Sequence, residues 1–225
     1  INRIQANEIL QLLESSRIDI LGKLASPTSW PMTYKHAPLK NVKLRPTSTQ
    51  AQTSVNLAFD IETDGIDSSC IHCVVTQDID TGLVTEYNDQ ASPYSSIANA
   101  ANDLDTADNI ISHNGIMFDI PQIKKHFPFF KGEAKHWDTL ILSRFFHPDL
   151  LDIDLRRKWP YMPARLYGSH SLEAYGYRLR CFKDEFGKTS DWKDWSQEMQ
   201  DYCKKDVAIL CKLWTHFQKS LKALS

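Results

Sequence analysis

Four acidic residues of this chain stand where a carboxylate is hard to explain as ordinary surface charge. Asp60 and Glu62 interrupt an apolar segment, Asp119 follows a strand-like segment and a turn, and Asp206 lies four residues after Tyr202. Like charges that gather at one site repel one another unless a cation lies between them, and Mg²⁺ and similar ions prefer oxygen ligands. The chemistry that these residues could perform is therefore metal-assisted hydrolysis.

The first pair of acids lies in a predicted buried strand. The run from Val55 to Ile61 is apolar and rich in residues that favour strands. Side chains alternate along a strand, so Asp60 and Glu62 share one face. Without a partner, two buried charges would cost several kcal/mol or shift their pKa values until one of them is neutral. The alternative interpretation is a pair of acids at an exposed strand end.

Asp119 is predicted near a helix N-terminus. Ile110–Ser112 reads as a short strand, His113–Gly115 as a turn, and Gly115–Phe127 as a helix with Pro121 in its first turn. An acid in a first turn also favours the helix dipole, so by itself Asp119 could be purely structural.

Asp206 lies on a predicted helix from about 196 to 219, with Ser196 as its N-cap. Residues four apart share a helix face, so Tyr202 and Asp206 are neighbours on a face that also carries core residues. The structural alternatives are a core tyrosine and an aspartate paired with Lys205.

In this order, Asp-x-Glu on a strand, Asn-x4-Asp at a strand–helix junction and Tyr-x3-Asp on a late helix resemble the DEDD superfamily of 3′→5′ exonucleases. The tyrosine form (DEDDy) is indicated because the histidine form would need histidine at position 201, which is Asp201. Further segments resemble the proofreading exonuclease domain of T-seven-like podovirus family A DNA polymerases: 111–115, 138–144, 168–179, 199–202 and 206–207. This resemblance spans about residues 55 to 217 and excludes about residues 1 to 50.

The resemblance implies a two-metal site. Asp60 would bridge two divalent ions, Mg²⁺ or Mn²⁺, Glu62 and Asp206 would complete the first ion's site, and Asp119 would hold the second. Tyr202 would orient the attacking water. The Thr63 backbone, His113 and Asn114 would contact the terminal nucleotide, and the products would be nucleoside 5′-monophosphates.

The resemblance also implies a partner and a setting. The substrate would be single-stranded DNA or a primer 3′ terminus, and the chain would be a proofreading domain, a split-polymerase subunit or a stand-alone phage enzyme. A polymerase domain or subunit is thus an expected partner. An RNase D-like 3′→5′ RNA exonuclease is one alternative, and a non-catalytic nucleic-acid-binding or polymerase-anchoring module is another.

Composition sets further bounds. The chain has 225 residues and a net charge of −2, and no run approaches the roughly 20 apolar residues of a membrane span. Five cysteines without a disulfide framework favour reduced thiols in the cytoplasm, that of a bacterial host if a phage encodes the chain. Residues 46 to 123 contain twelve Asp or Glu and no Lys or Arg. This asymmetry suggests an acidic metal pocket beside a basic substrate path, with these candidates: Lys124, Lys125, Lys131, Lys135, Arg156, Arg157, Lys158 and Arg165.

The predicted elements define the fold class. Three strands (55–62, 70–76 and 82–87) precede a helix (92–104), a fourth strand (109–112) and the helix that carries Asp119. Residues 137–146 could form a strand or a helix, 169–179 reads as a helix, and 148–168 and 181–195 read as loops, with Trp159, Tyr161, Trp192 and Trp195 as candidates for base stacking. This order predicts an α/β, RNase H-like mixed sheet flanked by helices. Residues 1–53 would form an N-terminal helix and extended arm, and 54–225 the exonuclease domain.

Overall fold

The computed structural model describes residues 54–181 and 192–224, and the predicted N-terminal helix and arm lie outside these ranges. The described elements form one compact unit, Thr53–Ala223. In chain order they are β1 (Asn56–Thr63), β2 (Ile71–Asp78), β3 (Val84–Tyr87), α2 (Ile97–Thr106), β4 (Asn109–Ser112), α3 (Asp119–His126), β5 (Lys135–Asp138), α4 (Thr139–Phe146), α5 (Leu150–Arg157), the 3-10 turn η1 (Ala164–Leu166), α6 (Leu172–Arg178) and α8 (Gln197–Lys222).

The five strands form one mixed sheet in the order β3-β2-β1-β4-β5. β1 pairs antiparallel with β2 and parallel with β4, and β4 pairs parallel with β5. The strand that carries Asp60 and Glu62 is therefore the central one. This sheet with helices on both faces confirms the predicted RNase H-like α/β architecture.

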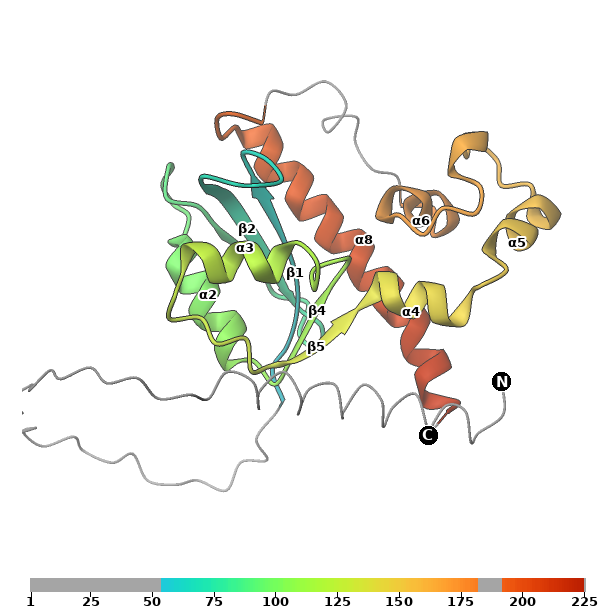
Figure 1. Ribbon diagram of the computed structural model, residues 1–225, viewed down its shortest axis with the longest axis horizontal. Helices are drawn as coiled ribbons and strands as arrows, with labels where there is room; N and C mark the ends of the chain where they lie inside the picture. Colours follow the sequence, from blue (N-terminus) through green and yellow to red (C-terminus); the bar gives the residue numbers. More distant parts are fainter. Residues whose placement is uncertain (1–53, 182–191, 225) are drawn as a thin grey trace, which may run out of the picture. The chain divides into compact units, whose positions relative to one another are not determined.

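Alternation along the strands separates two cores. Phe59 and Ile61 of β1 pack on one face with residues of α2 and α3, whereas Ala58 packs on the other face with α8 and α6. In Figure 1, α2 and α3 lie on one side of the sheet and α8 runs along the other. Because Asp60 and Glu62 have the same parity as Ala58, both acids face α8.

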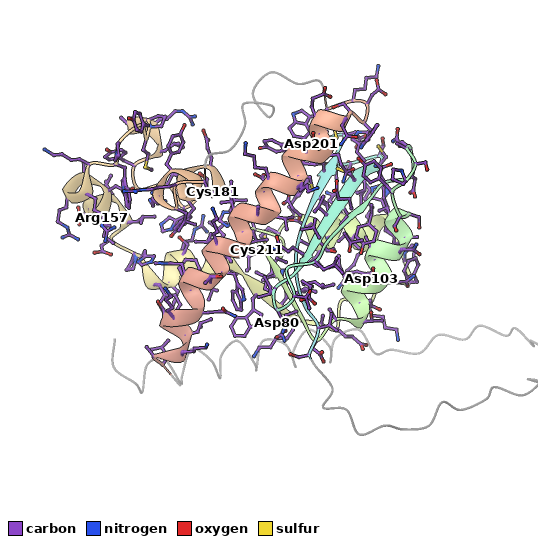
Figure 2. The ribbon with its side chains drawn as sticks, turned by 180° about the vertical axis from the view of Figure 1, so that it is seen from behind. Asp80, Asp103, Arg157, Cys181, Asp201 and Cys211 are labelled. Carbon is purple, nitrogen blue, oxygen red and sulfur yellow. The ribbon has the colours of Figure 1, made fainter. Side chains whose placement is uncertain are left out.

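The region between α4 and α6 corrects the prediction of a loop at 148–168. It contains α5 and η1, and it lies beyond α4, with Arg157 on the side away from the sheet (Figure 2). The sequence pattern does not reveal this helix because its burial contradicts its hydrophobicity: Leu151 and Leu155 are exposed, whereas Asp154 is fully buried. An ion pair with Arg178, with 2.6 Å between Asp154 Oδ2 and Arg178 Nη2, compensates that burial.

Other boundaries follow from capping. The undecided segment 137–146 contains both elements, because β5 ends at Asp138 and the carboxylate of Asp138 caps α4 by accepting from the Leu140 N–H at 2.9 Å. α2 begins at Ile97 rather than near Ser92, since Ser96 is its N-cap. Ser196 caps α8 as predicted. Among the described helices, none combines the length and apolar character that crossing a membrane requires.

Candidate active site

Asp60 and Glu62 project from β1 toward α8. Glu62 is buried and Asp60 is partly buried. The thiol of Cys203, on α8, donates to the backbone carbonyl of Asp60 at 3.4 Å, so helix and strand are in direct contact. One ligand atom from each of Asp60, Glu62 and Cys203 lies within 4.8 Å of the others. The two acids share a face of β1, as the alternation predicts, and they form a cluster with Cys203.

Asp119 is the first residue of α3 and is 4% exposed. Burial raises the pKa of its carboxyl to about 7, and the negative charge of Asp138 acts in the same direction. The backbone N–H groups of Asp119 and Ile61 oppose that shift by hydrogen bonding. The hydrogen bond from the Ile61 N–H places the Asp119 carboxyl beside β1. Ile61 is the residue that separates Asp60 from Glu62.

α8 contributes Tyr202 and Asp206 from one face. Asp206 is 4% exposed and Tyr202 is partly buried. The ring of Trp192 meets that of Tyr202 edge to face, with 6.0 Å between the centroids. Of the four predicted stacking aromatics, Trp192 is thus beside the candidate tyrosine.

One cavity of about 230 Å³ brings these residues together. Its lining includes Asp60, Glu62, Asp119, Tyr202 and Asp206, all five of the residues predicted to be catalytic, together with His113, Asn114, Ile61, Phe118 and Trp192. Thr63 is the exception, because it lies outside the lining and its hydroxyl donates to the Gly65 carbonyl at 2.8 Å. The acids come from β1, α3 and α8, which are remote in sequence.

The turn before α3 is tightly constrained. Asn114 has a φ of +67°, a left-handed conformation that asparagine tolerates better than most residues. Gly115 is required for a different reason, because a Cβ there would lie 2.1 Å from the Ser112 hydroxyl. The first residue of α4 also contacts this turn: the Thr139 hydroxyl lies 2.9 Å from His113 Nδ1 and donates to the Ser112 carbonyl.

The donor set fits hard divalent cations. Burial, and after it the neighbouring Cys73, Asp60 and Glu62, raises the pKa of the Cys203 thiol well above its usual value. The Cys203 S–H group donates its hydrogen bond to the Asp60 carbonyl. The four carboxylates that line the cavity supply oxygen ligands, which suit Mg²⁺ or Mn²⁺ better than zinc.

A larger cavity of about 750 Å³ adjoins the first and shares Asp60, His113, Asn114 and Asp206 with it. The rest of its lining comes from α4, the segment before α6 and the first turn of α6: Leu140, Arg144, Gly168, Ser169, His170, Ser171, Leu172 and Glu173. None of these was predicted as a site residue. They do fall in the segments 138–144 and 168–179 that carry the polymerase resemblance, which is a signal that could have identified them.

The proposed basic path is absent from both cavities: none of its eight candidates lines either one. Lys125 pairs with Asp67 at 2.5 Å, and Arg165 pairs at 2.8 Å with Glu173, a residue that lines the larger cavity. Within the described part of the chain, the cation in these linings is Arg144. Trp159 also packs structurally, because its indole N–H donates to Asp154 at 2.7 Å.

Comparison with known proteins identifies relatives among phage polymerases. The DNA-directed DNA polymerase of Escherichia phage T7 is 29% identical over 178 residues, which cover 68% of this chain and 25% of the polymerase. That of Enterobacteria phage T3 is 32% identical over 122 residues, which cover 44% of this chain and 17% of the polymerase. The chain thus spans a quarter or less of these relatives, and the predicted resemblance to polymerases of this phage group is confirmed.

A solved structure and a family model extend the comparison. The EXO domain of Aedes aegypti Nibbler is similar at 17% identity with a TM-score of 0.44, covering 76% of this chain and 86% of that chain. A family model described as the RNase_H superfamily matches residues 57–218, which include all four acids. The chain therefore belongs to the RNase H superfamily.

Proposed function

We propose that this protein is a metal-dependent 3′→5′ exonuclease that hydrolyses DNA to nucleoside 5′-monophosphates. The observation that supports this most is the convergence of Asp60, Glu62, Asp119 and Asp206 in one cavity with Tyr202. A merely structural role for these acids would not require them to face one another. Three of them are less than a tenth exposed, which is costly for charged groups that lack a cation.

Asp60, Glu62, Asp119 and Asp206 would hold two divalent ions. Such ions, when bound, lower the pKa of an attacking water and stabilise a leaving oxygen. The protein's own contribution is positional: Tyr202 would orient the water through its hydroxyl, and Trp192 packs against the Tyr202 ring. His113 and Asn114, which line both cavities, would contact the terminal nucleotide, with the backbone of Thr63 as a further contact.

The polymerase relatives support DNA as the substrate and a polymerase domain or subunit as a partner. The corresponding role is proofreading, in the cytoplasm of an infected bacterium. We assign residues 54–225 to the exonuclease domain, and residues 1–53 to a separate segment for contact with such a partner.

The test uses 5′-labelled single-stranded DNA, its duplex and a matched RNA, with Mg²⁺, Mn²⁺ or EDTA, resolved on a denaturing gel. We expect a metal-dependent ladder that shortens from the 3′ end, fastest on single-stranded DNA. Asp60→Asn and Asp206→Asn should lower the rate by about 100-fold or more, and Tyr202→Phe should lower it less. Faster cleavage of RNA would instead support the RNase D-like alternative. Absence of cleavage by folded protein would favour a binding or anchoring module.

A further inference from the structure

The larger cavity is lined by more polar side chains than the binding of a single scissile phosphate requires. It joins the acidic cavity through Asp60 and Asp206. Its other side includes Arg144, the loop Gly168–Ser171 and Glu173, whose carboxylate pairs with Arg165 at 2.8 Å. This loop presents the imidazole of His170, and Arg144 adds a positive charge. The two hydroxyls bond within the segment, since Ser169 donates to Ser171 at 3.0 Å and Ser171 caps α6. An arginine beside neutral hydrogen-bond donors is a typical arrangement for binding an anion.

Two hydrogen bonds with buried side chains fix the conformation of the loop Gly168–Ser171. The buried Asp154 carboxylate accepts from the Gly168 N–H at 2.8 Å, and Arg178 Nη1 donates to the Ser169 carbonyl at 2.8 Å. Asp154 and Arg178 are paired with side chains 0% and 6% exposed, so the loop rests on a buried ion pair. Polar groups on a fixed loop bind a ligand without the entropic cost of ordering it.

Hydrogen bonding determines which nitrogen of His170 is available. The Ser143 hydroxyl lies 2.6 Å from both His170 Nδ1 and the Tyr175 hydroxyl, and Ser143 and Tyr175 are buried. If Tyr175 donates to Ser143 and Ser143 donates to Nδ1, every buried hydroxyl hydrogen has an acceptor. The reverse direction would leave the Tyr175 hydrogen without one. His170 therefore carries its proton on Nε2 and can donate to a ligand.

Arg144 acts at the same place. Both residues line the larger cavity. Burial lowers the pKa of His170, and the charge of Arg144 is the next largest cause. Within the described residues, Arg144 has no carboxylate at ion-pair distance, so its charge is not neutralised by a neighbour. The cavity thus combines a cation with an oriented neutral donor.

We propose that Arg144 and His170 bind a backbone phosphate on the 5′ side of the scissile bond, so that the larger cavity accepts the strand upstream of the terminal nucleotide. The inference rests on the proposed exonuclease function. Because a 3′→5′ exonuclease removes the last nucleotide, every further phosphate of its substrate lies on the 5′ side. Ser143 is a positioning residue that acts through His170.

The test compares two substrates that differ in that phosphate. An oligothymidylate has upstream phosphates, whereas the p-nitrophenyl ester of thymidine 5′-monophosphate has only the one that is cleaved. We expect Arg144→Ala and His170→Ala to raise KM for the oligonucleotide by about tenfold to a hundredfold, the range for a hydrogen bond to a charged group. Their effect on the ester should be at least about tenfold smaller, and His170→Gln should restore part of the loss because its amide can donate from a similar position.

Salt dependence gives a second readout. For each phosphate of a single strand that a variant no longer neutralises, the slope of log Kd against log salt concentration should fall by about 0.7, as measured by fluorescence anisotropy in EDTA. Arg144→Ala should show this reduction, and Lys212→Ala, which removes an exposed cation outside both cavities, should not. Ser143→Ala should weaken binding less than His170→Ala.

The outcomes separate the upstream phosphate site from the exonuclease function. Equal losses on both substrates, or an unchanged KM and salt slope in Arg144→Ala, would overturn the phosphate site while leaving the exonuclease intact. If the wild-type protein cleaves neither substrate, the exonuclease function fails. The anisotropy measurement then decides the site alone, and an unaltered Kd in both alanine variants would overturn it.

Discussion

The Asp138 carboxylate accepts a hydrogen bond from the backbone N–H of Asn114 at 3.0 Å. Its second oxygen accepts from the Ile116 N–H at 3.2 Å, and the first also caps α4 through Leu140. One buried side chain thus joins the end of β5, the start of α4 and the turn that precedes Asp119. The position of the third acid depends on a residue that would not itself contact substrate.

Replacing Asp138 should therefore affect both stability and activity. In Asp138→Asn an amide N–H group would face at least one of these backbone donors, and we expect a loss of about 1–3 kcal/mol in the free energy of unfolding. The rate should fall because the turn and Asp119 shift. Urea unfolding and oligonucleotide cleavage measure the two effects. If Asp138→Asn has wild-type stability and full activity, the hydrogen bonds of the Asp138 carboxylate are dispensable.

Gly115→Ala tests the packing of the same turn. The added Cβ would lie 2.1 Å from the Ser112 hydroxyl and 3.3 Å from Asp119 Oδ2, so the turn must move. We expect destabilisation of about 1–3 kcal/mol together with reduced activity. Gly65→Ala is the matched control, since nothing lies within 4 Å of a Cβ at that position. Similar unfolding free energies for the two variants would contradict the clash.

Metal binding should be detectable without catalysis. Because the acids repel one another and are largely buried, a divalent ion that binds the folded state should stabilise it, by about 2.7 kcal/mol at a concentration 100 times Kd. We expect Mg²⁺ or Mn²⁺ to raise Tm of the wild-type protein and EDTA to reverse the increase. Asp206→Asn should lose most of the shift. An equal metal-induced shift in wild type and variant would place the ion elsewhere.

His136 should make stability depend on pH. Burial lowers the pKa of His136 to about 4, against an opposing effect of Asp138, and Nε2 lies 2.7 Å from the Ser112 hydroxyl. Between pH 6.5 and about 4 the unfolded chain binds a proton that the folded protein does not, so stability falls as pH falls through this window. From pH 7 to pH 5 the loss should be about 2 kcal/mol.

His136→Gln should remove that contribution. Unfolding by urea in EDTA at pH 7 and pH 5 gives the comparison, with the difference between the two pH values as the readout. Asp119, whose pKa is raised, has the opposite sign, since its protonation favours the folded state as pH falls. The contribution of Asp119 is the same in the wild type and in His136→Gln, so it cancels when the pH dependence of one protein is subtracted from that of the other. The same pH dependence in wild type and variant would exclude His136 as the cause.

Local periodicity was sufficient for much of the fold and for the identity of the candidate acids. Alternation in β1 put Asp60 and Glu62 on one face, and four-residue spacing put Tyr202 beside Asp206. These are consequences of backbone geometry, so they hold before any tertiary contact forms. The order of the motifs, together with their resemblance to a known family, then indicated which chemistry to expect.

Only the tertiary structure decided what depends on partners remote in sequence. α5 was missed because Asp154 is buried and Leu151 exposed, which makes sense only once Arg178 is seen beside Asp154. The proton position on His170 likewise depends on Ser143, 27 residues away. The sequence determined the acids and the strands and helices that carry them. Long-range ion pairs and hydrogen bonds, which local patterns do not encode, decided the shape of the cavity around those acids.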